Sequence, residues 1–257
     1  MNNPISSLER QNLILQFLLR SQRISIMEIC RSFSVSQATA RRDLETLARK
    51  GKVQRVHGGA ITLTQLAPEQ PTLQRQDEQA QEKLCIGQAA AALVHDGETV
   101  LLGSGTTVLE AARILRGCRN LTVITNSLPV INALAGAAEI TLICLGGMLR
   151  DSELSFIGHF TEQTLAEVRA DKVIIGTHAI HLEHGLTLEY LPETMTDRAI
   201  MKAGKEIIVV ADHTKFGRAT AVLLAPLESI HTLVTDQATP QEFIDAIQSR
   251  GINVIQA

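Results

Sequence analysis

Arg41 and Arg42 lie in a stretch whose polar residues could bind DNA. Ser36 has the position of a helix N-cap, and Ala40, Leu44 and Leu47 recur at helical spacing on one face. A helix that buries this apolar face presents its polar and cationic side chains elsewhere. We expect these side chains to meet base edges and phosphates in a major groove: Ser36, Gln37, Thr39, Arg41 and Arg42.

A solvated amphipathic helix with surface arginines is the ordinary alternative. The distribution of charge argues against it. Residues 1–60 contain ten Lys or Arg against four Asp or Glu, a net charge of +6, so the remaining residues carry −9 to give the whole-chain −3. A basic head on an acidic body is typical of a protein that neutralises phosphates with one part only.

Short elements around this stretch complete a DNA-binding motif. Ser6 with Glu9 and Ser25 with Glu28 have the spacing of capping boxes, so two helices are predicted to begin there. Apolar and polar residues alternate around Val53, and Gly58-Gly59 follows as a turn. Together they predict a hairpin after the helix that Ser36 begins. The hairpin would bring Arg55 and His57 against the DNA backbone or minor groove.

A second set of polar residues follows an apolar run, in the segment Gly103-Ser104-Gly105-Thr106-Thr107. A helical period begins directly afterwards, at Val108. Glycine backbone, hydroxyl groups and the free amides of a new helix form a cup suited to phosphate. A packing turn between strand and helix is the alternative, because such glycine-rich turns occur without a ligand.

Further polar residues come at the ends of other apolar runs. Short strands are predicted at 99–102, 121–125, 140–145, 172–175, 206–211 and 232–235, separated mostly by helices, the first of them at 82–94. This alternation predicts a mainly parallel sheet covered on both faces, with ligands bound at the carboxyl ends of its strands. The candidate effector residues at those ends are Asn126, Ser127, Gly146, Gly147, Asp212 and Lys215.

Length and composition fit two domains and a linker. We expect a winged helix-turn-helix at residues 1–60, a linker at 61–80 and an effector-binding, oligomerising α/β domain at 81–257. No apolar run has the length of a membrane span, and no signal peptide is evident, so a cytoplasmic protein is expected. The four cysteines have the spacing of neither a zinc site nor a disulfide framework.

The two halves together resemble one family of bacterial transcription regulators, the DeoR family. Its pattern V-S-x-x-T-x-R-R-D-L is matched by residues 35–44, and G-x-x-x-R-x-H-G-G-A by residues 51–60. The strand-end motifs listed above are similar to those of the family's C-terminal domain, so the resemblance covers nearly the whole chain. This chain departs from the family at Ala40, where a larger aliphatic residue is usual, and at Gly103, where Asp is usual.

The resemblance implies a C-terminal domain similar in fold to ribose-5-phosphate isomerase and the coenzyme A transferases. It also implies a sensor of phosphorylated sugars or related metabolites. We therefore expect a repressor of a sugar or carbohydrate catabolic operon that binds double-stranded operator DNA as a homodimer or tetramer and needs no cofactor. Ligand binding would weaken operator binding through the arrangement of the subunits.

Three alternatives are weighed against this interpretation. A sugar-phosphate isomerase needs a positioned carboxylate, which the segment 176–187 does not supply in the aspartate-rich form of those enzymes. His178, His181 and His184 could hold zinc if one face presented them, but the segment reads as a loop, so no metal site is expected. An architectural DNA protein would have no use for the phosphate-friendly strand ends.

Overall fold

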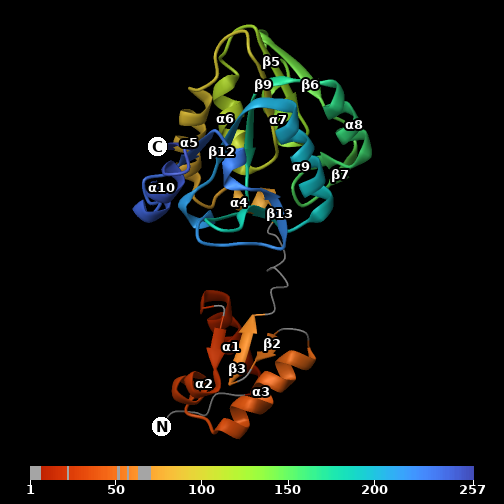
Figure 1. Ribbon diagram of the computed structural model, residues 1–257. Helices are drawn as coiled ribbons and strands as arrows, with labels where there is room; N and C mark the ends of the chain where they lie inside the picture. Colours follow the sequence, from red (N-terminus) through yellow and green to blue (C-terminus); the bar gives the residue numbers. More distant parts are fainter. Residues whose placement is uncertain (1–6, 22, 51–52, 57, 63–70) are drawn as a thin grey trace. The chain divides into compact units, whose positions relative to one another are not determined.

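The computed structural model describes residues 7–21, 23–50, 53–56, 58–62 and 71–257. The chain divides into two compact units, Met1–Pro68 and Glu69–Ala257 (Figure 1). Each has its own apolar core. We call them the head and the body.

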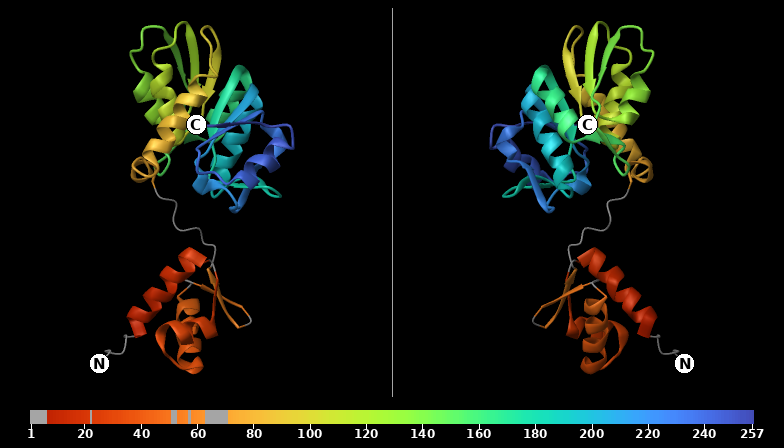
Figure 2. Two further views of the ribbon diagram at one scale, coloured as in Figure 1. Left: turned by 90° about the vertical axis from the view of Figure 1, so that its left-hand side faces the viewer. Right: turned by 90° about the vertical axis from the view of Figure 1, so that its right-hand side faces the viewer.

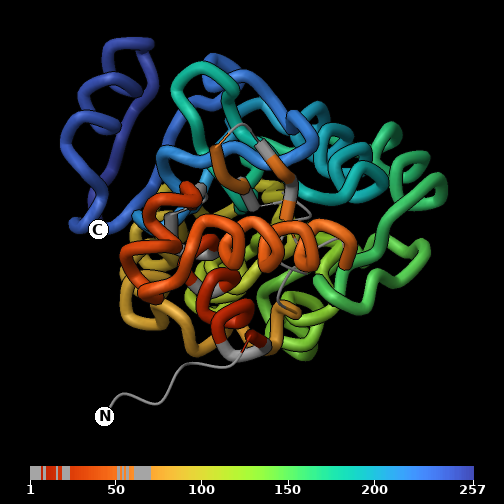
Figure 3. Tube along the Cα trace, turned by 90° about the horizontal axis from the view of Figure 1, so that it is seen from below, coloured from red at the N-terminus to blue at the C-terminus, as the bar shows by residue number. Residues whose placement is uncertain are grey.

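Within the described residues, the head contains three helices and a small antiparallel sheet. The coils of its helices can be followed in red and orange in Figure 3. The helices are α1 (Ser7–Ser21), α2 (Ile26–Phe33) and α3 (Gln37–Arg49). The strands are β1 (Arg23–Ser25), β2 (Val53–Val56) and β3 (Gly59–Thr62), in the order β1-β3-β2. The predicted helix-turn-helix and hairpin are thus present, and β1 is an addition that the sequence did not predict.

Caps and glycines define where these elements begin and turn. Ser25 and Glu28 form the predicted capping box: the Glu28 amide donates to Ser25 Oγ at 3.1 Å, and the Ser25 amide donates to Glu28 Oε2 at 2.7 Å. Gly58 turns the hairpin with a φ of 86°. A Cβ on Gly59 would lie 2.1 Å from the Ile24 carbonyl oxygen, so only glycine lets β3 pair with β1. The second predicted box, at Ser6, lies outside the described residues.

The stretch predicted as a linker contains packed residues at both of its ends. Strand β3 extends to Thr62, and a short helix α4 (Thr72–Arg75) belongs to the body. Thr72 is buried there, and its amide donates to the Ser152 carbonyl at 2.7 Å. The chain therefore joins the body eight residues before the next long helix, α5 (Ala80–Ala91), begins.

The body is built on a seven-stranded sheet in which all neighbouring strands are parallel, as predicted. Its strands, in sheet order, are β15 (Asn253–Gln256), β14 (Thr232–Thr235), β12 (Gly204–Val210), β9 (Ala170–Gly176), β4 (Thr99–Leu102), β5 (Leu121–Thr125) and β6 (Ile140–Cys144). The sequence predicted six of the seven; β15 is the one it did not.

Helices cover both faces of the sheet (Figure 2). One core cluster joins the sheet to α5, α6 (Thr106–Leu115) and α7 (Leu128–Leu134). The other joins it to α8 (His159–Glu167), α9 (Leu191–Ala203) and α10 (Gln241–Gln248). The burial of both faces explains why the central strands are nearly continuous apolar runs.

Smaller elements extend the body beyond this core. A hairpin consists of β7 (Met148–Arg150) and β8 (Ser155–Ile157). A second antiparallel sheet has the order β10 (Ala179–His181), β11 (Gly185–Leu188), β13 (Val222–Ala225). Two 3-10 turns, η1 (His213–Lys215) and η2 (Leu227–Ser229), follow β12 and β13. None of the described helices has the length and apolar character needed to cross a bilayer.

A buried ion pair fixes α3 against α1 in the head. Asp43 accepts from Arg10 Nε at 2.6 Å and also from Gln11 and Ser7, each at 3.1 Å. Burial alone would raise the pKa of Asp43, but the hydrogen bonds and the charge of Arg10 lower it overall. The ionised carboxylate therefore stabilises the position of the helix that carries the predicted DNA-binding residues.

We expect Asp43→Asn to destabilise the head by about 2–4 kcal/mol, because the buried Arg10 guanidinium loses its anionic partner. Calorimetry of the full chain would measure this. Glu45→Gln, on an exposed position of the same helix, is the control and should change little. Since the folded pKa is depressed, the contribution is present above the ordinary value of 3.8 and is lost as pH falls through the folded value. Equal stability of both variants would contradict this role.

Candidate functional site

The exposed face of α3 carries the side chains predicted to contact DNA. Gln37, Arg41 and Arg42 are exposed, while Ala40, Leu44 and Leu47 are buried in the head's core. The helix is therefore amphipathic in the predicted sense. Its two adjacent guanidinium groups stand clear of the core, where they can reach an external partner.

The other predicted DNA-binding residues also have structural roles. Ser36 Oγ caps α3 by accepting from the Thr39 amide at 3.2 Å and lies 3.0 Å from Thr39 Oγ1. Arg55, on β2, donates from Nη1 to the Arg41 carbonyl at 3.2 Å, which ties the hairpin to α3. His57 lies outside the described residues. The cap and the Arg55 contact position the face that Arg41 and Arg42 share.

In the body, a cavity lies where the order of the sheet reverses direction. From β4 the chain first adds β5 and β6 on one side, then places β9, β12, β14 and β15 on the other. Loops that leave β4 and β9 here separate to opposite faces, which opens a crevice at the carboxyl ends of these strands. The space within the crevice that a water-sized sphere can occupy is about 50 Å³.

The predicted phosphate cup forms one wall of this cavity. Ser104, Gly105, Thr106 and Thr107 all line it, at the N-terminus of α6. Gly105, the N-cap, has a φ of 114°, which favours glycine, and no side chain from the described part of the molecule caps this helix end. Its first amides and the positive end of the helix dipole are thus oriented for an anion.

Two lysines add positive charge beside the cup. Lys83, on α5, is buried and donates to the Arg75 carbonyl at 2.5 Å. Burial lowers the pKa of Lys83, as do the charges of Lys215 and Arg75, while Asp212 opposes the shift. Lys215 Nζ lies 3.9 Å from Asp212 Oδ2, as expected for a carboxylate that orients a lysine. A bound phosphate would stabilise both ammonium groups.

The remaining predicted effector residues do not line the cavity. Gly103 lies beneath it, where a Cβ would be 3.2 Å from Ile175 Cγ1. Asn126 and Ser127 are buried; the first donates to the Phe156 carbonyl at 3.0 Å and the second caps α7. The Gly146 carbonyl accepts from Thr161 at 2.7 Å, and a Cβ on Gly147 would collide with the same hydroxyl. These residues hold the loops after β5 and β6, which lie on the far side of β4 from β9.

The sequence reasoning missed the acidic wall of the cavity. Glu153, Glu193 and Asp197 line it from the β7–β8 turn and from α9. Arg75 pairs with Glu153, and Arg150 pairs with Glu193. The Pro192-Glu193 start of α9 was the available signal, because proline marks a first turn. However, nothing in the sequence shows that this turn faces the strand ends.

The three histidines separate in the structure. His178 follows β9, lines the cavity and pairs with Glu189. Burial would raise the pKa of Glu189, but the bond and charge of His178 lower it overall. His181 and His184 lie at the β10–β11 hairpin, so the segment predicted as a loop is mostly paired strand, because Gly185 allows a tight turn with a φ of 69°.

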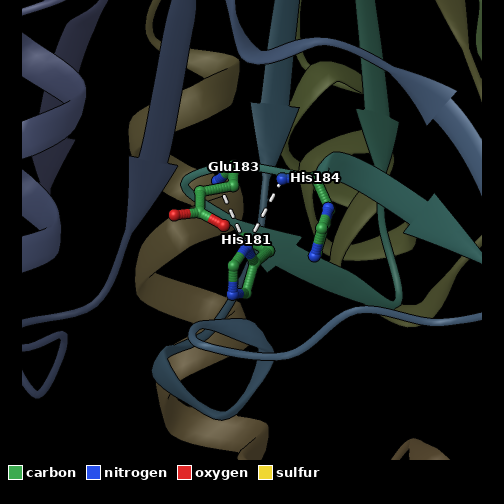
Figure 4. Close-up of side chains that lie close together, drawn as sticks. All are labelled: His181, Glu183 and His184. Carbon is green, nitrogen blue, oxygen red and sulfur yellow. Dashed lines mark hydrogen bonds between the residues drawn. The ribbon is translucent and has the colours of Figure 1, made fainter.

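His181, Glu183 and His184 lie close together at this hairpin, with candidate metal-ligand atoms within 4.8 Å of one another (Figure 4). His181 Nδ1 accepts from the backbone amides of Glu183 and His184 at 3.1 and 3.3 Å. An accepting Nδ1 carries no proton, so in the neutral ring Nε2 carries it and has no lone pair for a metal. The two rings stack with centroids 4.5 Å apart rather than converging on one point. The cluster is better explained as part of the turn.

Comparison with known proteins identifies the two units. Residues 10–66 match the DeoR-like helix-turn-helix domain, and residues 78–237 match the DeoR C terminal sensor domain. The chain belongs to the DeoR family. This DeoR-family chain is 34% identical over 235 residues to "Transcriptional repressor AccR" of Agrobacterium fabrum, with 91% of each chain covered. It is 35% identical over 247 residues to "HTH-type transcriptional repressor GlcR" of Bacillus subtilis, covering 96% of this chain and 95% of that relative.

Among solved structures, ribose 5-phosphate isomerase A of Methanocaldococcus jannaschii is similar over 54% of this chain and 55% of its own, at 20% identity and a TM-score of 0.40. The relatives named above are transcription regulators, and this chain is one as well, with a DNA-binding domain. Segment 176–187 lacks the aspartate-rich form of those enzymes, but other elements supply carboxylates to the cavity, among them Glu193 and Asp197 of α9. The case against an isomerase therefore rests on the family.

We expect Arg41→Ala or Arg42→Ala to weaken binding to operator DNA. Loss of a base contact should cost about 1–3 kcal/mol, and loss of a phosphate contact should lower the salt slope of binding by about one unit. Fluorescence anisotropy across a salt series measures both quantities. Arg113→Ala, an exposed change of the same charge on α6, is the control. Unaltered affinity in both head variants would remove α3 from the DNA interface.

Proposed function

We propose that this DeoR-family chain represses a sugar or carbohydrate catabolic operon and that a phosphorylated sugar or related metabolite releases it from its operator. The relatives AccR and GlcR are named as repressors. One observation carries the ligand class: the uncapped N-terminus of α6 meets Lys83 and Lys215 in a single cavity. Helix amides and ammonium groups together are suited to a phosphate dianion.

The way the chain enters the body supports coupling between ligand and DNA. Thr72 Oγ1 donates to Glu153 Oε2 at 2.9 Å, and Arg75 pairs with the same carboxylate. Arg75, Gln79 and Lys83 also line the cavity, so the first described residues after the head form part of the ligand site. A ligand there changes the free energy of docking this segment. Residues 61–80 would carry that change toward the head, with a coupling of about 1–3 kcal/mol.

Exposed apolar side chains on the body support a homo-oligomer. They include Ile143, Met148, Leu149, Phe160, Leu191 and Met195, and Phe160 is 72% exposed. These residues belong to β6, β7, α8 and α9, which lie on one side of the body in Figure 1. β6 also ends the sheet, so its outer edge has no strand paired to it among the described residues. Self-association through these side chains would pair two heads for a symmetric operator in the cytoplasm.

The proposed function predicts a response to phosphorylated metabolites. In a titration of the full chain against DNA from upstream of its own gene, at least one phosphorylated sugar should weaken binding about 5–150-fold, the range of typical allosteric coupling. The unphosphorylated sugar is the matched control for each compound. Operator affinity that stays constant across the whole panel would contradict the proposal.

Lys215→Met should blunt this response while operator affinity without ligand stays close to wild type, because Lys215 lines the cavity and lies outside the head. Removing one charge-assisted contact should raise the half-effective ligand concentration about 10- to 100-fold, equivalent to roughly 1.4–2.7 kcal/mol. Lys202→Met, on an exposed position of α9, is the control. A folded Lys215 variant that loses operator binding, or one that responds to the ligand as the wild type does, would show that the cavity is misassigned.

A further inference from the structure

Asp197 is a buried carboxylate of the cavity wall that lacks a full set of partners. Asp197 lies on α9 and is 5% exposed. It lines the same cavity as the phosphate cup. Its Oδ1 is buried and receives no hydrogen bond from the part of the chain that the structure describes. A buried carboxylate oxygen left in this state is costly, so the site is incomplete as it stands.

The arginines beside Asp197 do not supply its missing partner. Glu153 and Glu193 share this wall, and each is already bound to an arginine: Glu153 to Arg75 and Glu193 to Arg150. Thr72 also donates to Glu153, and Ser155 to Glu193 at 3.2 Å. These pairs leave Asp197 as the carboxylate of this wall without a cation bonded to it among the described residues.

The ionisation of Asp197 reflects this surplus of negative charge. Burial and repulsion from Glu153 raise the pKa of Asp197 to about 7, while the charge of Arg150 opposes the rise. His178 and Lys83 also line the cavity, and Glu189 is paired with His178. A cation that entered the cavity would favour the ionised form and pair with it.

The cavity therefore carries charge of both signs. Lys83, Lys215 and the start of α6 supply its positive groups, and α9 and the β7–β8 turn supply carboxylates. A sugar hydroxyl could donate to Oδ1 but would leave the charge of Asp197 uncompensated. An ammonium group supplies both a hydrogen-bond donor and the opposite charge.

We infer that Asp197 binds an ammonium group of the effector, and that the effector is a phosphorylated amino compound of the amino-sugar phosphate class. The inference rests on the proposed function, because it takes the α6 end as the phosphate site. It adds a specificity-determining residue to that site: Asp197 would select an amine over a hydroxyl at the position that it contacts.

The test is calorimetric titration of the full chain with matched pairs of probes. Glucosamine 6-phosphate is compared with glucose 6-phosphate, and galactosamine 6-phosphate with galactose 6-phosphate. In at least one pair the amine should bind about tenfold or more tightly, equivalent to roughly 1.4 kcal/mol. Asp197→Asn keeps the size of the side chain and removes its charge. In this variant the two members of that pair should bind with about equal affinity. Asp245→Asn, an exposed change on α10, is the control.

The outcomes separate the two proposals. Binding of both members of every pair with equal affinity, or an amine preference that survives Asp197→Asn, would overturn the role of Asp197 and leave the phosphate site standing. If no phosphorylated probe binds, and inorganic phosphate does not bind either, the proposed effector site itself fails. Because the comparison within each pair uses the wild-type chain, it holds even if the Asp197 variant folds poorly.

Discussion

The Arg75–Glu153 ion pair is the contact on which the arrangement of the body's ligand site depends. It fixes α4 to the β7–β8 turn, and Thr72 adds a second donor to the same carboxylate. Through this pair, the segment that follows the head in sequence forms one wall of the cavity, with Arg75, Gln79 and Lys83. A ligand in the proposed site would contact the segment that leads to the head. Its binding would then change how that segment is held, which is the physical requirement for allosteric control.

The head and the body use buried charge in different ways. In the head, Asp43 is saturated by Arg10, Gln11 and Ser7, so its charge serves to hold two helices in a fixed relation. In the body, two acid–arginine pairs are complete, whereas Asp197 has an oxygen without a donor among the described residues. A satisfied charge gives rigidity to the surface that we expect to contact DNA. An unsatisfied one raises the energy of the empty cavity and so favours a ligand that completes it.

The sequence predicted those features that depend on local pattern. Helix caps such as Ser25 and Ser36, the Gly58 turn and the apolar runs of β4, β5 and β14 need only a few neighbouring residues to be recognised. The strand-end rule correctly gathered Ser104–Thr107, Asp212 and Lys215 at one cavity, although it also included Asn126 and Gly147, which serve packing. Strand order explains only part of this division, because β12 and β5 each lie one strand from the β4–β9 pair, yet the loop after β12 lines the cavity and the loop after β5 does not. That order, and the approach of Arg75 and Asp197 to the cavity, depend on long-range packing that no local pattern records.

The reversal of strand order also bears on how the protein is made. The cavity joins Arg75 to Lys215, so its walls come from chain segments about 140 positions apart, and β9 must insert beside β4 before they can meet. On a ribosome the head emerges and can fold long before the last of those segments exists. If the proposed function holds, a nascent or prematurely terminated chain would have a folded DNA-binding domain without the cavity that senses the effector, and removal of incomplete chains would help to keep the repressed genes inducible.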